Sequence, residues 1–422
     1  MNHHPLKDSL IDELHNRPFP VVALPAQVSS LVFLHTGERK LEIDKLKDLA
    51  NRHNIPAPEE NADCYYQSFP LFDLRWEFHN EFSTYTVIRH CDTPQSLGEN
   101  IFSLVDTDWV EDLGGQLIAA NHIDLRSASM SPATPELVSD QFDGQRLVGG
   151  KIYDGYATIW TSVQAQYDGF IRTLVIDEGM DSAQAGRVIR NLLEIAAYRS
   201  MTLLALPIAR QLMPEVRQLE QRLVETNNKL NDIVTLEDEQ NLMDELISEA
   251  TQLEKLVADH NFRFSATEAY FNLTESRLEM LREQKMPAIR TLKQFHARRF
   301  IPAFNTCMSV VKRKENLSKR ISRTSELLHL RLQLSLEAQN QKLLSSMDNR
   351  SELQLRLQQT VEGLSVVAMT YYSMKLIELL LKPVPLETFV PISQGVALAI
   401  LTPVVFFGAM MVMVRIRKKL HR

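Results

Sequence analysis

The stretch from Ile392 to Val414 reads ISQGVALAILTPVVFFGAMMVMV and contains no charged residue over 23 positions. A helix needs about 20 apolar residues to cross a bilayer, so this stretch predicts a membrane-spanning helix. Pro403 is tolerated inside such a helix and produces at most a kink. We therefore expect the end of the chain to lie in a membrane, with the lipid bilayer as its first partner.

A basic tail, RIRKKLHR, follows this stretch directly at residues 415–422. Positive clusters next to a spanning helix favour the cytoplasmic side, where anionic lipids also attract them. The tail is therefore predicted to be cytoplasmic and to help anchor the chain through five side chains: Arg415, Arg417, Lys418, Lys419 and Arg422.

A second apolar segment, VEGLSVVAMTYYSMKLIELLL, occupies residues 361–381. Its charged residues Lys375 and Glu378 are three apart, so on a helix they can pair or lie at the membrane interface. The proline-rich link KPVPLETFVP at 382–391 cannot continue a helix. The two segments, 361–381 and 392–414, thus predict a transmembrane helical hairpin. In the alternative, the first segment lies flat in the interface or belongs to a soluble stalk.

The middle of the chain, residues 181–360, is rich in helix-forming residues and predicts an α-helical, coiled-coil stalk. Residues 183–212 are apolar but include Arg190, Glu194 and Pro207, which favours a buried, kinked helix over a third span. Prolines predict breaks near residues 286–287 and 301–302. A coiled-coil seam is indicated by apolar residues at steps of four, three, four and seven: Leu212, Val216, Leu219, Leu223 and Leu230.

Charge is segregated along this helical region. Residues 215–259 hold twelve acidic residues against four basic ones, and residues 290–323 hold ten basic residues against the single acid Glu315. The simpler interpretation is an antiparallel bundle in which the two arms lie side by side. The alternative is a basic arm that binds anionic lipid or nucleic acid.

The last part of the stalk carries two apolar faces. At about 100° per residue, Leu327, Leu330 and Leu334 share one face, while a second face contains Ile321, Leu328, Leu332 and Leu336. A helix with two apolar faces needs two partners. One is a neighbouring helix of the same chain, and the other is expected to be a second copy, which predicts a homo-oligomer.

Residues 1–180 differ in composition and predict an α+β domain with a mixed sheet and helices on one face. Strands are predicted at 28–36 and 115–127, with a hairpin at 71–90 that turns at His79-Asn80. Two or three further strands are expected within 151–179, and helices at 37–54 and 134–142. The start of the chain, MNHHPLKDSL, lacks the features of a secretory signal, so this domain is expected in the cytoplasm.

Composition excludes several classes of function. A net charge of −7 argues against a dedicated nucleic-acid binder. The chain has 14 glycines and contains no glycine-rich phosphate-binding motif. Cys64, Cys91 and Cys307 are far apart and form no CxxC pair, so neither a disulfide framework nor a zinc site is indicated. No cofactor or metal is predicted.

Two groups of polar residues are candidates for chemistry in the first domain. Arg75, Glu77 and His79 alternate and share a strand face with Asp73, as a metal or acid–base site requires, although a solvated face has the same pattern. The motif ELHNRPFP contains His15, Arg17 and Pro18, and Arg17 is suited to bind an anion or carboxylate. Capping and packing are the alternative roles for this motif. We find no nucleophile motif, and predict no catalytic residue.

Six segments resemble a family of bacterial proteins described as membrane-anchored and of unknown function, and together they cover nearly the full length. They are ELHNRPFP (13–20), LRWEFHNEFSTYT (74–86), LLEIAAYRSMTLLALPIAR (192–210), RFSATEAYF (263–271), LEAQNQKLLSSM (336–347) and LQLRLQQTVEGLSVVAMTYY (353–372). The resemblance implies a protein of the bacterial inner membrane and supplies no catalytic residues; together with the two predicted spans, this gives a multi-pass inner-membrane protein.

In layout alone, the chain is also similar to the homopentameric magnesium transporters, with a cytoplasmic domain, a stalk, two spans and a basic tail. The Gly-Met-Asn motif of those transporters is absent, and LLKPVP stands in its place at 380–385. Layout does not establish function.

These observations favour a non-enzymatic, oligomeric membrane protein that displays its first domain as a scaffold or sensor. The alternative is an ion channel or transporter. In that case the first span would line a pore with Glu362, Ser365, Met369 and Ser373, which fall within an arc of roughly 80°. An enzyme with its cleft in the first domain is the third hypothesis.

Overall fold

The computed structural model describes residues 4, 7, 20–35, 39–91, 101–130, 135–233, 235–381 and 394–420. The chain divides into two compact units, which are described separately. The first comprises residues 1–232 and 242–324, and the second comprises residues 233–241 and 325–422. The domain limits at 180 and 360, which rest on composition, stay predictions.

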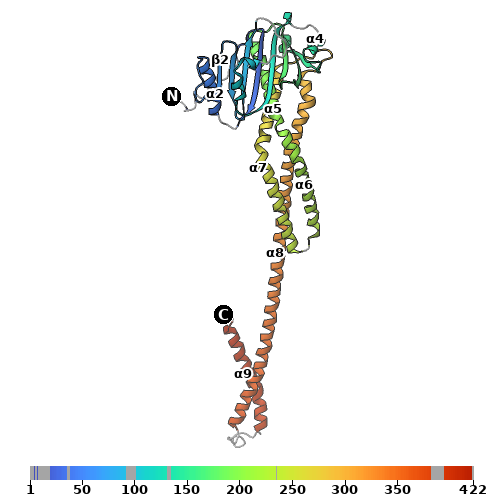
Figure 1. Cartoon of the computed structure of the whole chain (residues 1–422). Helices are drawn as coiled ribbons and strands as arrows, with labels where there is room; N and C mark the ends of the chain where they lie inside the picture. Colours follow the sequence, from blue (N-terminus) through green and yellow to red (C-terminus); the bar gives the residue numbers. More distant parts are fainter. Residues whose placement is uncertain are drawn as a thin grey trace. The chain divides into compact units, whose positions relative to one another are not determined.

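The first unit contains an eight-stranded mixed sheet in the order β2-β3-β4-β1-β5-β8-β7-β6 (Figure 1). All neighbouring strands are antiparallel except β5 and β8, which are parallel. The strands are β1 (Ala26–Leu34), β2 (Cys64–Ser68), β3 (Asp73–Phe78), β4 (Phe82–His90), β5 (Gln116–Ser127), β6 (Val148–Ile152), β7 (Ala157–Ala165) and β8 (Ile171–Asp177). The predicted strands and the hairpin that turns at residues 79–80 are thus confirmed.

Helices cover both faces of this sheet, so the expectation of helices on one face was wrong. One face packs against α2 (Arg39–Arg52), the 3-10 helix η1 (Ile101–Leu104), α3 (Thr107–Glu111) and α4 (Pro135–Asp140). The opposite face packs against α5 (Ser182–Leu203). The reason lies in the central strands, whose side chains are apolar on both sides: in β1, Val28 and Val32 face α5 while Leu31 and Phe33 face α2.

A buried carboxylate holds α2 to the sheet. Glu42 is only 6% exposed and accepts hydrogen bonds from the indole of Trp76 (2.7 Å), the hydroxyl of Ser83 (2.8 Å) and the hydroxyl of Tyr85 (2.8 Å). Burial, together with the Glu42 charge, raises the pKa of Tyr85. Three neutral donors thus satisfy a charge that would otherwise be costly to bury.

Helix α5 begins with a capping box, in which Asp181 accepts from the Gln184 N–H (2.6 Å) and Gln184 accepts from the Asp181 N–H (2.8 Å). The chain continues through α6 (Ala205–Asp232), α7 (Leu236–Met280) and α8 (Leu292–Leu381). The predicted apolar seam is buried at Leu212, Val216, Leu219 and Leu223. Arg313 of α8 pairs with Glu220 of α6, which supports the bundle interpretation of the segregated charges.

Helix α8 continues through Pro302, so the break predicted at residues 301–302 was wrong. Proline costs an interior helix one backbone hydrogen bond, but tertiary packing can offset that loss. Here Phe300 is 3% exposed, and Phe304 stacks on Phe271 of α7 with ring centroids 3.7 Å apart. The break predicted at residues 286–287 is confirmed, because α7 ends at Met280 and α8 begins at Leu292.

In the second unit, residues from the α6–α7 connection pack on α8. Arg331 donates to the Ile233 carbonyl (3.0 Å), and Ser335 donates to the Glu239 carboxylate (3.1 Å). Leu328 is fully buried on this side of α8. On the other side, Leu327, Leu330 and Leu334 are 54–64% exposed.

Among the described residues, two helical segments are long and apolar enough to cross a membrane: Ser182–Leu230 and Gly395–Ile416. Half of the most apolar part of Ser182–Leu230 is buried inside the molecule, as predicted for this stretch. The second segment lies in α9 (Gln394–Leu420), and no part of its most apolar stretch is buried inside the molecule. The end of α8 is not among these segments, so the first of the two predicted spans stays a prediction.

Candidate functional site between the sheet and helix α5

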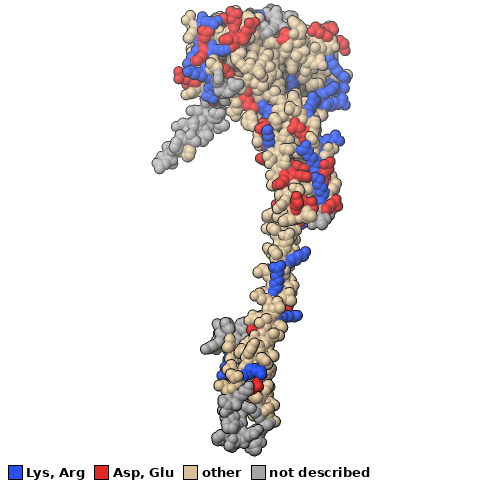
Figure 2. Space-filling model, turned by 60° about the horizontal axis from the view of Figure 1, so that its bottom comes forward, with Lys and Arg blue, Asp and Glu red and all other residues tan. Residues whose placement is uncertain are grey.

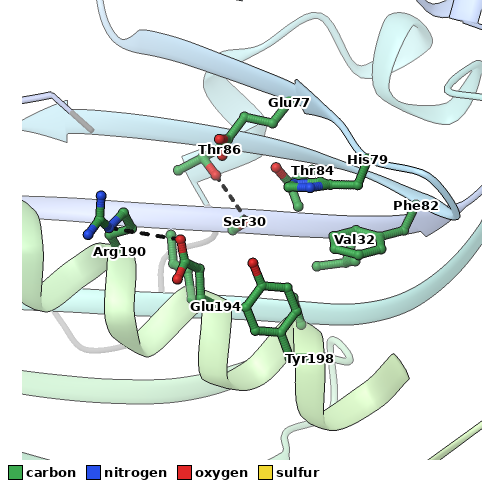
Figure 3. A pocket seen from close by; sticks show the side chains of 12 residues that line it. Ser30, Val32, Glu77, His79, Phe82, Thr84, Thr86, Arg190, Glu194 and Tyr198 are labelled. Atoms are coloured by element: carbon green, nitrogen blue, oxygen red, sulfur yellow. Dashed lines mark hydrogen bonds and ion pairs between the residues drawn. The ribbon is translucent and has the colours of Figure 1, made fainter. Parts of the chain in front are cut away.

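A small pocket lies where β1, β3 and β4 face α5 (Figure 3). Its volume is about 30 Å³, roughly the room that one water molecule takes up. The strands contribute Ser30, Glu77, Thr84 and Thr86, and His79 follows the end of β3. Arg190, Glu194 and Tyr198 point toward the sheet from α5, where their spacing of four residues places them along one side of the helix (Figure 3).

The strand residues predicted as a candidate site are partly brought together here. Arg75 is 2% exposed and donates to Glu77 (2.7 Å), so this face of β3 is not a solvated surface. Burial by itself would lower the pKa of Arg75. The hydrogen bond to Glu77 and the negative charge of Glu77 together raise it by more, so the pKa of Arg75 is raised overall. The His79 ring stacks on Phe82 with centroids 4.4 Å apart.

Asp73 lies outside this pocket, although it shares the face of β3. Its carboxylate accepts from the Tyr66 hydroxyl (2.9 Å) and lies 3.4 Å from the ring nitrogen Nε2 of His90. Burial and this hydrogen bond raise the pKa of Tyr66 to about 12. The structure thus separates Asp73 from Glu77 and His79. Within the part of the chain that is described, no three His, Cys, Asp or Glu side chains are grouped so that they could hold a metal ion.

Both carboxylates of the pocket are held by arginines. Glu194 pairs with Arg277 of α7 and lies 3.8 Å from Nε of Arg190. Glu77 pairs with Arg75. A general base needs a carboxylate or imidazole poised to take a proton from a nucleophile, whereas these carboxylates are engaged in ion pairs. The arrangement is therefore suited to binding a small polar group or to coupling the sheet with the helices.

Helix α7 contacts the wall of this pocket at two positions and the neighbouring β3–β4 turn at a third, and the three positions are spaced seven residues apart. Arg263 pairs with Glu81 in the β3–β4 turn (2.8 Å), and Tyr270 stacks on Tyr198 with centroids 5.8 Å apart. The third position is Arg277, which holds Glu194. Burial raises the pKa of Tyr270, and the hydrogen bond to Glu81 raises it further. A change of shape in the pocket therefore has a direct mechanical route to α7.

The residues from α5 were missed as site residues because more than 110 positions separate them from Glu77 of β3, and pairing across such a distance depends on the topology of the sheet. The available signal was the spacing of four residues between Arg190, Glu194 and Tyr198, which places these polar side chains on one side of a helix. The other candidate group, His15, Arg17 and Pro18, lies outside the described residues.

The predicted pore residues lie on the last part of α8, and a single chain does not test a pore. Glu362, Ser365 and Ser373 are half-buried, whereas Met369 is 43% exposed. The Ser365 hydroxyl donates to the Val361 carbonyl of its own helix (2.8 Å), and Glu362 accepts from Gln358 (3.1 Å).

The basic tail continues helix α9 as far as Leu420. Arg415 is exposed, whereas the side chains of Arg417, Lys418 and Lys419, and the whole of Arg422, lie outside the described part of the chain. No disulfide joins the cysteines within the described chain, where Cys307 is buried and Cys64 and Cys91 are half-buried.

The fold and pocket define a protein with an N-terminal α/β sheet unit, a long helical region and a terminal apolar helix. Over residues 2–420 the chain matches, and belongs to, a family described as "Protein of unknown function (DUF3422)". No curated protein matches it.

Proposed function

We propose that this chain is an oligomeric, multi-pass protein of the bacterial inner membrane that displays its α/β unit in the cytoplasm as a scaffold or sensor. The observation that carries the proposal is the exposure of α9. Along this helix Ile400, Val404, Phe407 and Met411 are 60–66% exposed. A continuous apolar surface of this kind is unstable in water and indicates burial in lipid or against a partner.

The end of α8 supports a helical hairpin with α9. Leu364, Tyr372, Leu376 and Leu379 are 59–72% exposed, so this segment also presents an apolar surface that water does not favour. Its charged pair, Lys375 and Glu378, is joined at 2.9 Å, and pairing lowers the cost of placing both charges near a membrane interface. Two spans would place both ends of the chain on one side.

The sensor role is supported by the links between the pocket and α7. Arg263, Tyr270 and Arg277 join one helix to both walls of the pocket. Binding of a small polar molecule would change these contacts, and α7 would carry the change along the bundle. The channel hypothesis ranks second, because the Ser365 hydroxyl is already donated to its own helix backbone.

The test of anchoring is fractionation of cells that produce the full chain. We expect the protein to stay with membranes after a carbonate wash and to need detergent for release. A fluorescent protein that folds only in the cytoplasm, fused in turn to each end, should be bright at both ends. Release by carbonate would refute the anchoring, and a dark fusion at one end would refute the two-span arrangement.

A further inference from the structure

A second hollow lies where β6 and β7 meet the first turns of α8. Four arginines line it: Arg146, Arg290, Arg298 and Arg299. Val148, Ser162, Gln164 and Phe295 complete its wall. The hollow has a volume of about 740 Å³, within the roughly 300–1000 Å³ of typical small-molecule pockets. We call it the arginine groove.

Main-chain hydrogen bonds fix the position of the groove. The segment between α7 and α8 pairs with the edge strand β6, where the Gly149 N–H donates to the Arg290 carbonyl (2.8 Å). Lys151 and Gln284 exchange two further backbone hydrogen bonds (3.1 and 2.7 Å). Arg290 is therefore held at the edge of the sheet, and Arg298 and Arg299 follow within the first two turns of α8. The groove is preformed rather than dependent on a ligand.

The charge in the groove is not balanced by the described residues. None of its four arginines forms an ion pair with a described carboxylate, whereas Arg313 further along α8 pairs with Glu220. The pKa of Arg290 is lowered, chiefly by the charge of Arg146 and then by burial and by Arg298 and Arg299. In the view of Figure 2, Lys and Arg side chains gather along the right-hand side of the sheet unit, the side on which Figure 1 has α4 and the first turns of α8.

The backbone N–H groups at the start of α8 are not available to attract an anionic ligand to the groove. The Leu292 and Lys293 N–H groups donate to the Glu283 carboxylate (2.6 and 2.9 Å), so the end of the helix already has its anion. A ligand of the groove would therefore be recognised by the arginine side chains.

We propose that the arginine groove binds a soluble polyphosphate anion. Planar guanidinium groups offer paired N–H donors that match phosphate oxygens two at a time, and a short phosphate chain places several negative charges within one small volume. A long nucleic acid would need basic residues along an extended track, whereas these four converge on one hollow. The exposed amide of Gln164 offers a further hydrogen bond to a phosphate oxygen. The proposal does not depend on membrane anchoring.

The test is calorimetric titration of the full chain, purified in a neutral detergent, with inorganic triphosphate. We expect saturable binding of one triphosphate per chain that weakens as salt is added. Removing one charge-assisted contact costs about 1.5–3 kcal/mol, and each 1.4 kcal/mol is tenfold in affinity. The double variant R298Q/R299Q removes two such contacts, about 3–6 kcal/mol together, and should therefore bind at least roughly 100-fold more weakly.

The matched control is R320Q/R323Q, which removes two exposed arginines from the same helix about 33 Å further along its axis. It should bind triphosphate as the unchanged chain does. R146Q tests the groove from a different element and should also weaken binding, provided that thermal unfolding without ligand shows the variant to be folded.

Three results would overturn the proposal. The first is no saturable binding of triphosphate to the unchanged chain. The second is equal loss of binding in R298Q/R299Q and R320Q/R323Q, which would mean general attraction to positive charge. The third is binding of soluble inositol trisphosphate without binding of triphosphate, which would indicate that a lipid headgroup is the ligand.

Discussion

Replacing Glu42 by leucine should destabilise the first unit strongly. The change removes the acceptor for Trp76, Ser83 and Tyr85 and leaves three donors in a buried site. Each unsatisfied buried donor costs about 1–3 kcal/mol, so the loss is about 3–9 kcal/mol before any gain from burying the leucine. For a unit of this size 1 kcal/mol corresponds to about 2–4 °C, and we expect the melting temperature to fall by at least roughly 6 °C.

Glutamine at the same position should cost much less. Its carbonyl oxygen can take the place of Oε2, which accepts from both Trp76 and Tyr85. The Ser83 hydroxyl can turn and accept from the amide. E42Q therefore loses only the extra strength that a charged acceptor gives to these hydrogen bonds, which lowers the free energy of unfolding by about 1–2 kcal/mol.

The assay is thermal unfolding of the full chain in detergent, followed by tryptophan fluorescence. Trp76 donates to Glu42, and Trp109 lies 5.9 Å from Tyr85 between ring centroids, so two of the three tryptophans report on this side of the sheet. The control is E111L, at an exposed glutamate of α3. Equal melting temperatures for E42L and E42Q, or for E42L and E111L, would refute the reasoning.

Three further predictions concern pH, packing and assembly. Burial, together with the charge of Arg172, lowers the pKa of His122 to about 4, whereas in the unfolded chain the pKa of histidine is about 6.5. The folded state therefore gains stability from a neutral His122 that is fully present above pH 6.5 and is lost as the pH falls towards 4. Urea unfolding at stepped pH should show a loss on the order of 3 kcal/mol from His122 and a similar loss from His296, whose pKa burial also lowers to about 4. H122N should therefore remove about half of the pH dependence, and an unchanged slope in H122N would exclude His122 as a cause. In G149A the new Cβ would lie 2.0 Å from the Ile159 carbonyl oxygen, whereas nothing lies within 4 Å of a Cβ added at Gly114. G149A should therefore destabilise the chain by about 3 kcal/mol or more, and G114A should destabilise it by about 1 kcal/mol at most. Similar melting temperatures for the two variants would contradict this account. L330E introduces a charge on the exposed leucine face of α8 and should dissociate the expected oligomer, as measured by the mass from light scattering. Q339E lies on the opposite side of the helix and should leave the oligomer intact. Dissociation by both variants, or by neither, would exclude this face as the interface.

Much of the local structure could be predicted because the deciding signals are local. Alternation in residues 71–90 and the polar turn at 79–80 defined the β3–β4 hairpin, and unbroken apolar composition defined α9. The seam at Leu212, Val216, Leu219 and Leu223 was predicted by its spacing alone. Each of these patterns lies within about twenty residues.

What could not be predicted depends on contacts that are distant in sequence. Strand β2 is short, and its CYYQS sequence carries little alternation. Coverage of both sheet faces follows from the chain path after β4 and β8, which no local pattern contains. Pro302 was expected to end a helix because the packing of Phe300 and Phe304 against Phe271 of α7 cannot be read from the residues around it. The pocket itself joins β3 to α5, and only the folded sheet brings them together.

One feature of the core bears on how the chain is made. Leu278, Leu281 and Leu292 pack into the same cluster as Val28 and Ile123 of the sheet, although the last strand ends at Asp177. A ribosome adds about 5–20 residues per second, so the strands wait roughly 6–23 s before these leucines are synthesised. During that interval the nascent sheet exposes apolar surface on its α5 side, which makes it a substrate for chaperones that bind chains still attached to the ribosome.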